Sequence, residues 1–230
     1  MKRPKLVTTS ISKSVREEVD GDSLLQEALA RGIVNISAAA RLLKPAIVSS
    51  TGRNVSEEAI ITSLKRIKGA YRRGTLGYLR VLAKSSVEVK TDLALVSVEV
   101  DPEASAKIKD VAFKNYDAFV QISSSPNAYS LVFERSLFGY LRGKFEEDQI
   151  MEAKTELAAL IIHSPDEIIE TPGCVAAIYN RVGRGGINVV DTVSNYTDTI
   201  LVVKMGEVVK AFTAVTDLIS EARRLGGRQH

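Results

Sequence analysis

The sequence predicts an α+β protein, with a small helical N-terminal domain followed by two ferredoxin-like units of the form βαββα. Two observations lead to this prediction. Apolar residues recur at helical spacing over about the first third of the 230-residue chain. From residue 78 onward, β-branched runs alternate with helical segments, and the same order of elements occurs twice. We therefore expect three parts, at residues 1–85, 86–154 and 155–230.

The helical domain is predicted from three segments that combine an apolar stripe with end signals. Residues 20–32 carry leucines and alanines at helical spacing and finish in glycine, a common helix terminator. Residues 35–45 form the next helix, which Pro45 is expected to end or kink. Residues 56–68 begin at Ser56, whose hydroxyl suits an N-cap, and carry the third stripe.

The first βαββα unit begins with a strand at 93–100, where apolar and β-branched residues dominate. Helical spacing follows at 104–113. Strands are expected at 117–123 and 128–134, joined by a turn that contains proline and asparagine. Residues 135–154 are predicted to form the closing helix.

The second βαββα unit repeats this order with a strand at 156–164 and a helix at 173–183. Strands at 187–193 and 199–204 follow, and a helix at 208–224 closes the unit. A split βαβ sandwich needs one more strand than this unit supplies. Because unpaired sheet edges need cover, that strand is expected from elsewhere in the chain or from a partner.

Charge is distributed unevenly along the chain. Residues 1–90 contain 17 Lys and Arg against 8 Asp and Glu, a balance of +9, and residues 91–230 contain 14 against 20, a balance of −6. The two parts add up to the overall charge of +3. Such asymmetry indicates an anionic partner for the first part, although small domains also differ in charge by chance.

Several classes of protein are disfavoured by composition. The chain has no run of 18 apolar residues, the length that would indicate a membrane span. The basic N-terminus also lacks the apolar segment of a secretory signal, so we expect a cytoplasmic protein. Cys174 is the single cysteine, and the two histidines, His163 and His230, cannot form a metal site or a catalytic triad on their own. We therefore predict a protein that is not an enzyme and that has no cofactor.

The stretch TPGCVAAIYNRVGRGGINVVDTVSN, residues 171–195, combines signals seldom found together. Pro172-Gly173 precedes an apolar helical stripe, and Gly186-Ile187-Asn188 precedes a β-branched strand. These residues resemble the ACT domain, in particular the paired ACT domains of aspartate kinase. The likeness covers about 156–225. The whole arrangement resembles uncharacterised archaeal ACT-containing proteins that are predicted to regulate amino-acid metabolism.

The resemblance implies a regulatory protein that binds a free amino acid as its effector. The N-terminus of the helix that follows Gly173 would offer unpaired N–H groups to a carboxylate. The resemblance implies this ligand set: Thr171, Gly173, Cys174, Val175, Asn188, Val189, Val190, Ser194 and Asn195. Val190 stands where some lysine-sensing members have an acidic residue, which favours a smaller or apolar amino acid. The alternative is a unit that serves only in dimerisation.

The basic helical domain has two possible roles. Helices at 37–49 and 56–68 could form a helix-turn-helix, with strands after residue 78 as a wing. The residues expected to contact phosphates are then Arg53, Lys65, Arg66, Lys68, Arg72 and Arg73. Glu57 and Glu58 at the start of the second helix would repel phosphate. The alternative role is docking on a biosynthetic enzyme, and in either case we expect a homodimer or higher homo-oligomer.

Residues 69–77 have the glycine spacing of a phosphate-binding loop but lack the lysine and hydroxyl residue that should follow. They are therefore predicted to form a basic linker.

Overall fold

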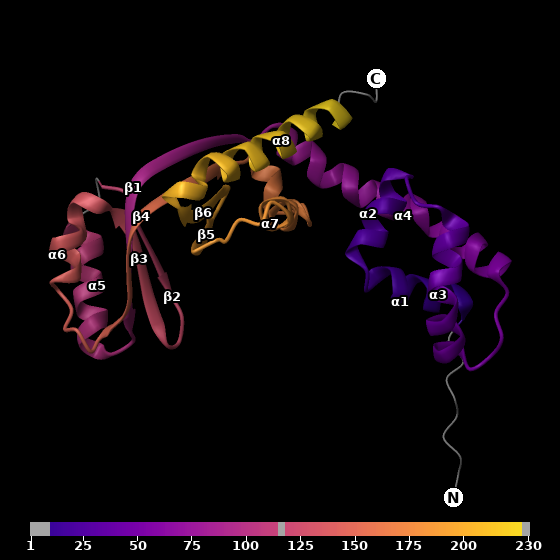
Figure 1. Ribbon diagram of the computed structural model, residues 1–230, viewed down its shortest axis with the longest axis horizontal. Helices are drawn as coiled ribbons and strands as arrows, with labels where there is room; N and C mark the ends of the chain where they lie inside the picture. Colours follow the sequence, from indigo (N-terminus) through magenta and orange to yellow (C-terminus); the bar gives the residue numbers. More distant parts are fainter. Residues whose placement is uncertain (1–9, 115–117, 227–230) are drawn as a thin grey trace, which may run out of the picture. The chain divides into compact units, whose positions relative to one another are not determined.

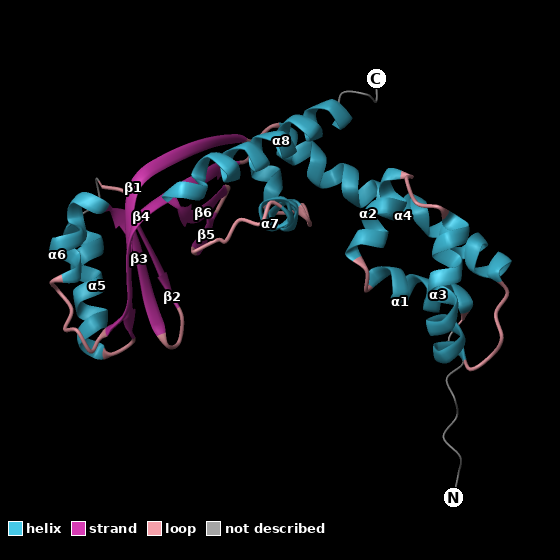
Figure 2. Cartoon of the chain, viewed as in Figure 1, coloured by secondary structure: helices cyan, strands magenta, loops and turns pink. Residues whose placement is uncertain are grey.

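The computed structural model describes residues 10–114 and 118–226, and the side chains at 72–76, 112–114 and 226 lie outside that description. Two compact units are present, Met1–Tyr78 and Leu79–His230. The first contains helices, and the second combines helices with one antiparallel sheet (Figures 1 and 2). The predicted α+β class is therefore confirmed.

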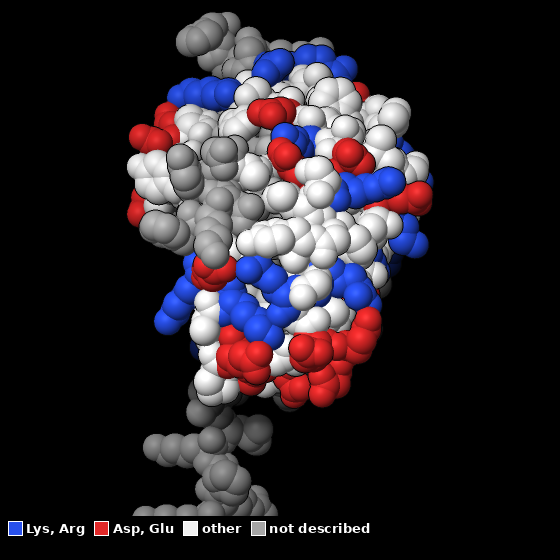
Figure 3. All heavy atoms as spheres, turned by 90° about the vertical axis from the view of Figure 1, so that its left-hand side faces the viewer, with Lys and Arg blue, Asp and Glu red and all other residues white. Residues whose placement is uncertain are grey.

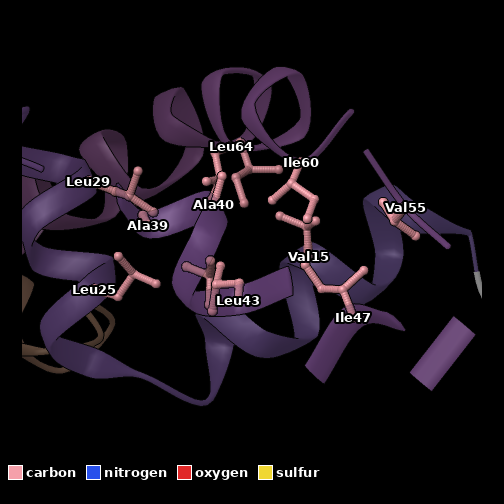
Figure 4. Packing of buried hydrophobic residues seen from close by; sticks show 12 residues of the cluster. Val15, Leu25, Leu29, Ala39, Ala40, Leu43, Ile47, Val55, Ile60 and Leu64 are labelled. Atoms are coloured by element: carbon pink, nitrogen blue, oxygen red, sulfur yellow. The ribbon is translucent and has the colours of Figure 1, made fainter. Parts of the chain in front are cut away.

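The first unit is built from helices α1 (Ile11–Asp20), α2 (Ser23–Arg31), α3 (Ile36–Thr51) and most of α4 (Glu57–Ala83). Their apolar faces meet in one cluster, seen in Figure 4, which includes Val15, Leu25, Leu29, Ala39, Ala40, Leu43, Ile47, Val55, Ile60 and Leu64. The predicted end signals are confirmed at two places. Gly32 ends α2 with φ +74°, and the Ser56 hydroxyl accepts the Ala59 N–H at 3.3 Å.

One expectation for this unit is wrong, and one helix was missed. Pro45 does not end its helix, because α3 continues to Thr51. Leu43 and Ile47 on either side of the proline are buried, and their packing outweighs the lost backbone hydrogen bond. Helix α1, whose sequence is strongly charged, was not predicted.

The basic linker expected at 69–77 is also wrong, since these residues lie within α4. The strands expected from residue 78 start only at Ser86. Leu79 and Leu82 are buried at helical spacing, and this packing continues the helix beyond its glycines.

The second unit follows the chain order β1 (Ser86–Glu99), α5 (Pro102–Lys114), β2 (Val120–Ser124), β3 (Ala128–Glu134), α6 (Phe138–Arg142), β4 (Ile150–His163), α7 (Cys174–Arg184), β5 (Asp191–Asn195), β6 (Asp198–Lys204) and α8 (Val208–Gly226). Short 3₁₀ turns lie at Arg135–Leu137, Asp166–Ile168 and Met205–Glu207. The strands form one six-stranded sheet in the order β2-β3-β1-β4-β6-β5, and every neighbouring pair is antiparallel.

The two long strands at the centre of this sheet are each shared between the repeats. Residues 95–98 of β1 pair with 150–154 of β4, which gives the first repeat its fourth strand. Residues 86–90 of β1 pair with 159–163 of β4, which gives the second repeat its fourth strand. The strand that the second repeat lacks in sequence is therefore supplied from elsewhere in the same chain.

The halves of each shared strand meet at a residue in the left-handed region. Asp92 in β1 has φ +58° and Glu156 in β4 has φ +60°, and the pairing register shifts beside them. Positive φ at such a bulge bends the strand, so its two halves serve different parts of the sheet. Two non-glycine residues at positive φ, which is uncommon outside glycine, therefore mark equivalent positions of an internal repeat.

Two boundaries in the second unit differ from expectation. Residues 135–154 were predicted to be one helix, but helix ends at Arg142 and β4 begins at Ile150. The strand expected at 187–193 lies at Asp191–Asn195. The helical spacing of Leu141 and Phe145, both buried under the first repeat's sheet, explains why the helix was predicted too long.

Each side of the sheet has its own apolar cluster. On the helix-covered side of the first repeat, residues of α5 and α6 pack on β1 and β3. The opposite faces of both repeats share a second cluster, in which buried residues of β1, β3, β4 and β6 contact one another: Leu93, Leu95, Val132, Leu157, Ala159, Ile161, Ile200 and Val202. We call this set the shared cluster, because it joins the two repeats.

Candidate functional site

The segment that connects β4 to α7 forms an exposed corner at residues 171–175, called here the 171–175 corner. Gly173 stands at the N-cap of α7 with φ +95°, a conformation that favours glycine. Among the described residues, no side chain accepts a hydrogen bond from the first turn of α7. The positive end of the helix dipole and its free N–H groups therefore face a glycine without a side chain.

The other residues of the corner have supporting positions. The Thr171 hydroxyl donates to the Glu167 carbonyl oxygen at 2.6 Å. Cys174 is buried, and burial raises the pKa of its thiol above the usual value. A protonated, buried thiol is not nucleophilic, so Cys174 serves as a small packing residue. Val175 is half-buried beside it.

The first repeat closes the equivalent corner with its own carboxylate. Asp101 precedes α5 and accepts the Ala104 N–H at 2.8 Å, and the side-chain amide of Gln149 donates to its other oxygen at 3.2 Å. An N-cap carboxylate occupies the position that an anionic ligand would take. Of the two repeats, the second therefore has the helix N-terminus that is open to a ligand.

The predicted ligand residues divide between the two ends of α7. His163, Asp198 and Asn195 lie in one row across β4, β6 and β5, so Ser194 and Asn195 lie at the end of the sheet from which the chain enters the corner. Residues 188–190 precede β5 at the opposite end. The 11 residues of α7 separate these ends by roughly 16 Å. One small ligand cannot contact both groups within a single repeat.

Residues 188–190 have structural surroundings of their own. Asn188 is exposed, and Val189 is half-buried. Val190 packs against the shared cluster, and its N–H donates to the Val202 carbonyl oxygen at 2.7 Å. Val190 thus extends the pairing of β5 with β6.

Asp191 was not among the predicted site residues, although it follows Val190 directly. One carboxylate oxygen accepts the Thr192 N–H at 2.6 Å, and the other is buried without a hydrogen-bond partner among the described residues. Burial raises the pKa of this carboxyl group. Its sequence signal is a charged residue at a strand position directly opposite buried Val202, where an apolar side chain is expected.

The residues proposed to contact nucleic acid differ in their surroundings. Arg53 and Lys65 are exposed, but the Arg66 guanidinium donates to the Ser12 hydroxyl of α1. Lys68 is half-buried, with its ammonium beside Gly32 at the end of α2. The side chains of Arg72 and Arg73 lie outside the described residues.

The expected wing is contradicted by the structure, because α4 continues to Ala83 and β1 pairs within the sheet of the second unit. Glu57 and Glu58 occupy the first turn of α4, as the sequence indicated. Figure 3 shows positive and negative side chains in neighbouring groups on the side of the second unit formed by α5 and α6. Ion pairs there join Lys107 to Glu103 at 2.7 Å and Lys144 to Asp110 at 2.9 Å.

Two further features of the described residues concern membrane spans and metal sites. None of their helices is long and apolar enough to cross a membrane. No group of three or more His, Cys, Asp or Glu residues that could hold a metal ion occurs within the same ranges.

Comparison with known proteins gives matches among solved structures. No family model and no curated protein matches the chain. The aspartate kinase of Clostridium acetobutylicum is 14% identical over 59% of this chain, with a TM-score of 0.49. The regulatory subunit of aspartate kinase from Thermus thermophilus is 16% identical over 57% of this chain and 95% of its own, with a TM-score of 0.48. The Synechocystis aspartate kinase is 17% identical over 60% of this chain, with a TM-score of 0.49.

The matched region spans 34% of the Clostridium enzyme and 27% of the Synechocystis enzyme.

Proposed function

We propose that this protein is a non-catalytic regulator of amino-acid metabolism, built from a helical unit and two ACT-like repeats, that binds a free amino acid at the 171–175 corner. The observation that supports this most directly is the uncapped N-terminus of α7 behind exposed Gly173. Helix N-termini bind carboxylates, because backbone N–H groups and the dipole both favour negative charge there. The absence of a side chain at Gly173 lets a ligand approach the backbone.

The two repeats differ in a way that sets the stoichiometry. Asp101 already fills the equivalent position in the first repeat, so the proposal requires one amino acid per chain. Of the predicted ligand residues, Thr171, Gly173, Cys174 and Val175 lie at the corner, with Ser194 and Asn195 at the same end of the sheet. Asn188, Val189 and Val190 can contribute to that ligand only from a second copy of the repeat.

The experiment is a screen of the common amino acids for an increase in melting temperature. A ligand at 100 times its dissociation constant stabilises the folded state by about 2.7 kcal/mol, which such a screen detects readily. The variant that tests the site is Gly173→Ala. Its matched control is Gly186→Ala, which also introduces a side chain at positive φ, +66°, but near the other end of α7.

Both alanines strain the backbone, by about 1 kcal/mol each. A methyl group at Gly186 would meet only the Lys210 ammonium, at 4.0 Å, among the atoms within that distance. We expect both variants to melt at a lower temperature and only Gly173→Ala to lose the ligand-induced increase. If no amino acid stabilises the wild type, or if Gly173→Ala keeps the full increase, the proposed site is wrong.

The output of the helical unit has two candidates, binding DNA and docking on a biosynthetic enzyme. Glu57 and Glu58 at the start of α4 would repel phosphate, and the Arg66 guanidinium donates to the Ser12 hydroxyl. A mobility shift at two salt concentrations decides between them. If the helical unit binds DNA through phosphates, its affinity for DNA must fall steeply as the salt concentration rises. Replacing both Lys65 and Arg66 by alanine should then reduce this salt dependence by an amount equal to about two phosphate contacts.

We also propose a homodimer or higher homo-oligomer, although the second repeat does not need a partner's strand to complete its sheet. Residues 86–90 cover the edge that was expected to need a partner, so the exposed edges of the described sheet are β2 and β5. Light scattering tests the proposal directly. A mass of 25.0 kDa at micromolar protein would show a monomer and exclude contributions to the site from a second copy.

A further inference from the structure

The C-terminal end of α4 is hydrogen-bonded to a side chain of α8. The Arg223 guanidinium donates to the Ala83 carbonyl oxygen at 2.9 Å and to the Ser85 carbonyl oxygen at 3.1 Å. The last carbonyl groups of a helix have no partner within it, and a cation there also complements the negative end of the dipole. Arg223 therefore caps α4 from a helix that is distant in sequence.

The same end of α4 is fastened to the segment that follows β4. Ser85 is fully buried, and its hydroxyl lies 3.0 Å from the Ser164 hydroxyl. The Lys84 ammonium pairs with a carboxylate oxygen of Glu167 at 2.7 Å. The Ser164 N–H in turn donates to the Thr197 carbonyl oxygen at 3.1 Å, which ties this segment to the β5–β6 turn.

The segment after β4 leads directly into the 171–175 corner. The Glu167 carbonyl oxygen accepts the Thr171 hydroxyl at 2.6 Å, and the Thr171 N–H donates to the Ile168 carbonyl oxygen at 3.3 Å. Glu167 is thus bonded through its side chain to Lys84 and through its main chain to the corner. A change at Thr171 reaches the end of α4 through one intervening residue.

We propose that occupation of the 171–175 corner is coupled to the C-terminal end of α4 through Glu167 and Ser164, with Arg223 as the second attachment. The identity of the ligand rests on the function proposed above, whereas the contacts themselves are present without one. Because α4 runs unbroken from Glu57 in the first unit to Ala83 in the second, its end is where the sheet unit can influence the helical unit.

The Lys84–Glu167 pair cannot carry this coupling by its charges alone. Both side chains are more than half exposed, and exposed ion pairs contribute little to stability. The Ser85–Ser164 pair, in which Ser85 is buried, must therefore transmit most of the effect through the main chain that runs from Ser164 to Glu167. The test is therefore made at Thr171, whose hydroxyl joins the corner to that main chain.

The first arm of the test uses the full chain without ligand. Thr171→Val removes the hydroxyl at nearly constant volume, and amide hydrogen exchange is followed by NMR at the Lys84 and Ser85 N–H groups, which donate to Val81 and Leu82 at 3.0 Å. We expect these amides to exchange about three to tenfold faster, as expected for the loss of one hydrogen bond that restrains them.

Thr213→Val in α8 is the matched control, because its hydroxyl makes the same kind of contact, to the carbonyl oxygen four residues earlier, at 2.9 Å. Amides in β3 report any loss of global stability. The change in exchange rate at Lys84 and Ser85 is therefore compared with the change in β3 of the same variant. If Thr171→Val leaves Lys84 and Ser85 as well protected as Thr213→Val does, the coupling does not exist.

The second arm adds whichever amino acid raises the melting temperature. We expect ligand to slow exchange at Lys84 and Ser85 in the wild type by a factor of three or more, and to have a smaller effect on these amides in Thr171→Val at equal saturation. Binding without any change at these amides refutes the coupling and leaves the proposed function intact. If no amino acid binds, the proposed function fails, and the ligand-free arm still decides the coupling.

Discussion

Leu93 and Leu157 form a cross-strand pair at the point where the two shared strands bend, and they give the sharpest test of the fold. Both are buried, with 0% and 1% of their surface exposed, and both belong to the shared cluster. Each is the first residue after a positive-φ position, Asp92 or Glu156. They are therefore equivalent residues of the two repeats in direct contact.

Replacing Leu157 by alanine should leave a cavity, because paired strands on both sides hold the backbone in place. Large-to-small changes of this kind cost about 2 to 5 kcal/mol. For a unit of this size, each kcal/mol lowers the melting temperature by roughly 2 to 4 °C. Met151→Ala on the same strand is the control, since Met151 is 62% exposed and its truncation should cost under about 0.5 kcal/mol.

The assay is amide hydrogen exchange in β3 and β6, which lie in different repeats. If the repeats share β1 and β4, they must open together, and Leu157→Ala should lower the free energy of opening equally in both strands. The double variant with Leu93→Ala should show a coupling of about 0.5 to 3 kcal/mol, as expected for residues in contact. A loss of protection confined to β6 would refute the shared-strand argument.

Three further predictions concern charged residues of the sheet. Glu156→Gly should raise the free energy of unfolding by about 0.5 kcal/mol in urea titration, because glycine relieves the positive φ, whereas Glu152→Gly in the extended part of β4 should lower it by a similar amount. The pKa of His163 is raised, mainly by its hydrogen bond to Asp198 at 2.9 Å. Its contribution to stability is therefore present below the unfolded pKa of about 6.5 and is lost as pH rises through the folded pKa. His163→Gln should remove this pH dependence of stability. The Asp191 pKa is raised by burial, so wild-type stability should fall as pH rises from about 4 through the folded pKa, and Asp191→Asn should make this part of the urea-titration profile flatter. For His163 and Asp191, a variant whose stability depends on pH as the wild type does would contradict the assigned pKa shift. For Glu156, a free energy of unfolding that does not rise in the glycine variant would contradict the assigned strain.

The local elements were predictable where one signal dominates. The strand at 128–134 has the bounds that the sequence indicated, because it follows a turn whose Ser125 side chain accepts the N–H groups of the next residues. Gly186 takes the positive φ expected after α7. These features depend on neighbours in sequence, and a single chain shows those neighbours directly.

Features that depend on tertiary packing were not predictable in the same way. The strand that completes the second repeat, at residues 86–90, precedes the first repeat in sequence, and nothing in its own residues identifies its partner. The N-terminal part of β4 was assigned to a helix for a similar reason: residues 150–154, IMEAK, are mostly exposed and lack the strict polar–apolar alternation of a half-buried strand. Pairing with β1, rather than local propensity, makes them a strand.

The candidate site shows the same division between local and tertiary information. Pro172-Gly173 predicted the helix start and its open N-terminus, because both follow from backbone conformation. The distance between the corner and residues 188–190 depends on the direction of β5 in the sheet and could not be judged from the sequence.

Shared strands also explain how the two repeats can differ without separating. Because β1 and β4 each belong to both repeats, neither repeat has a complete sheet without the other. Asp101 can therefore close the first corner, giving up any ligand there, while that repeat still supplies the strand on which the second depends. Gly173 leaves the second corner open without a side-chain cap, which costs the helix only about a few tenths of a kcal/mol. A duplicated sheet in which one helix N-terminus is capped internally and the other is left uncapped is consistent with our proposal that one repeat provides the framework and the other binds an amino acid.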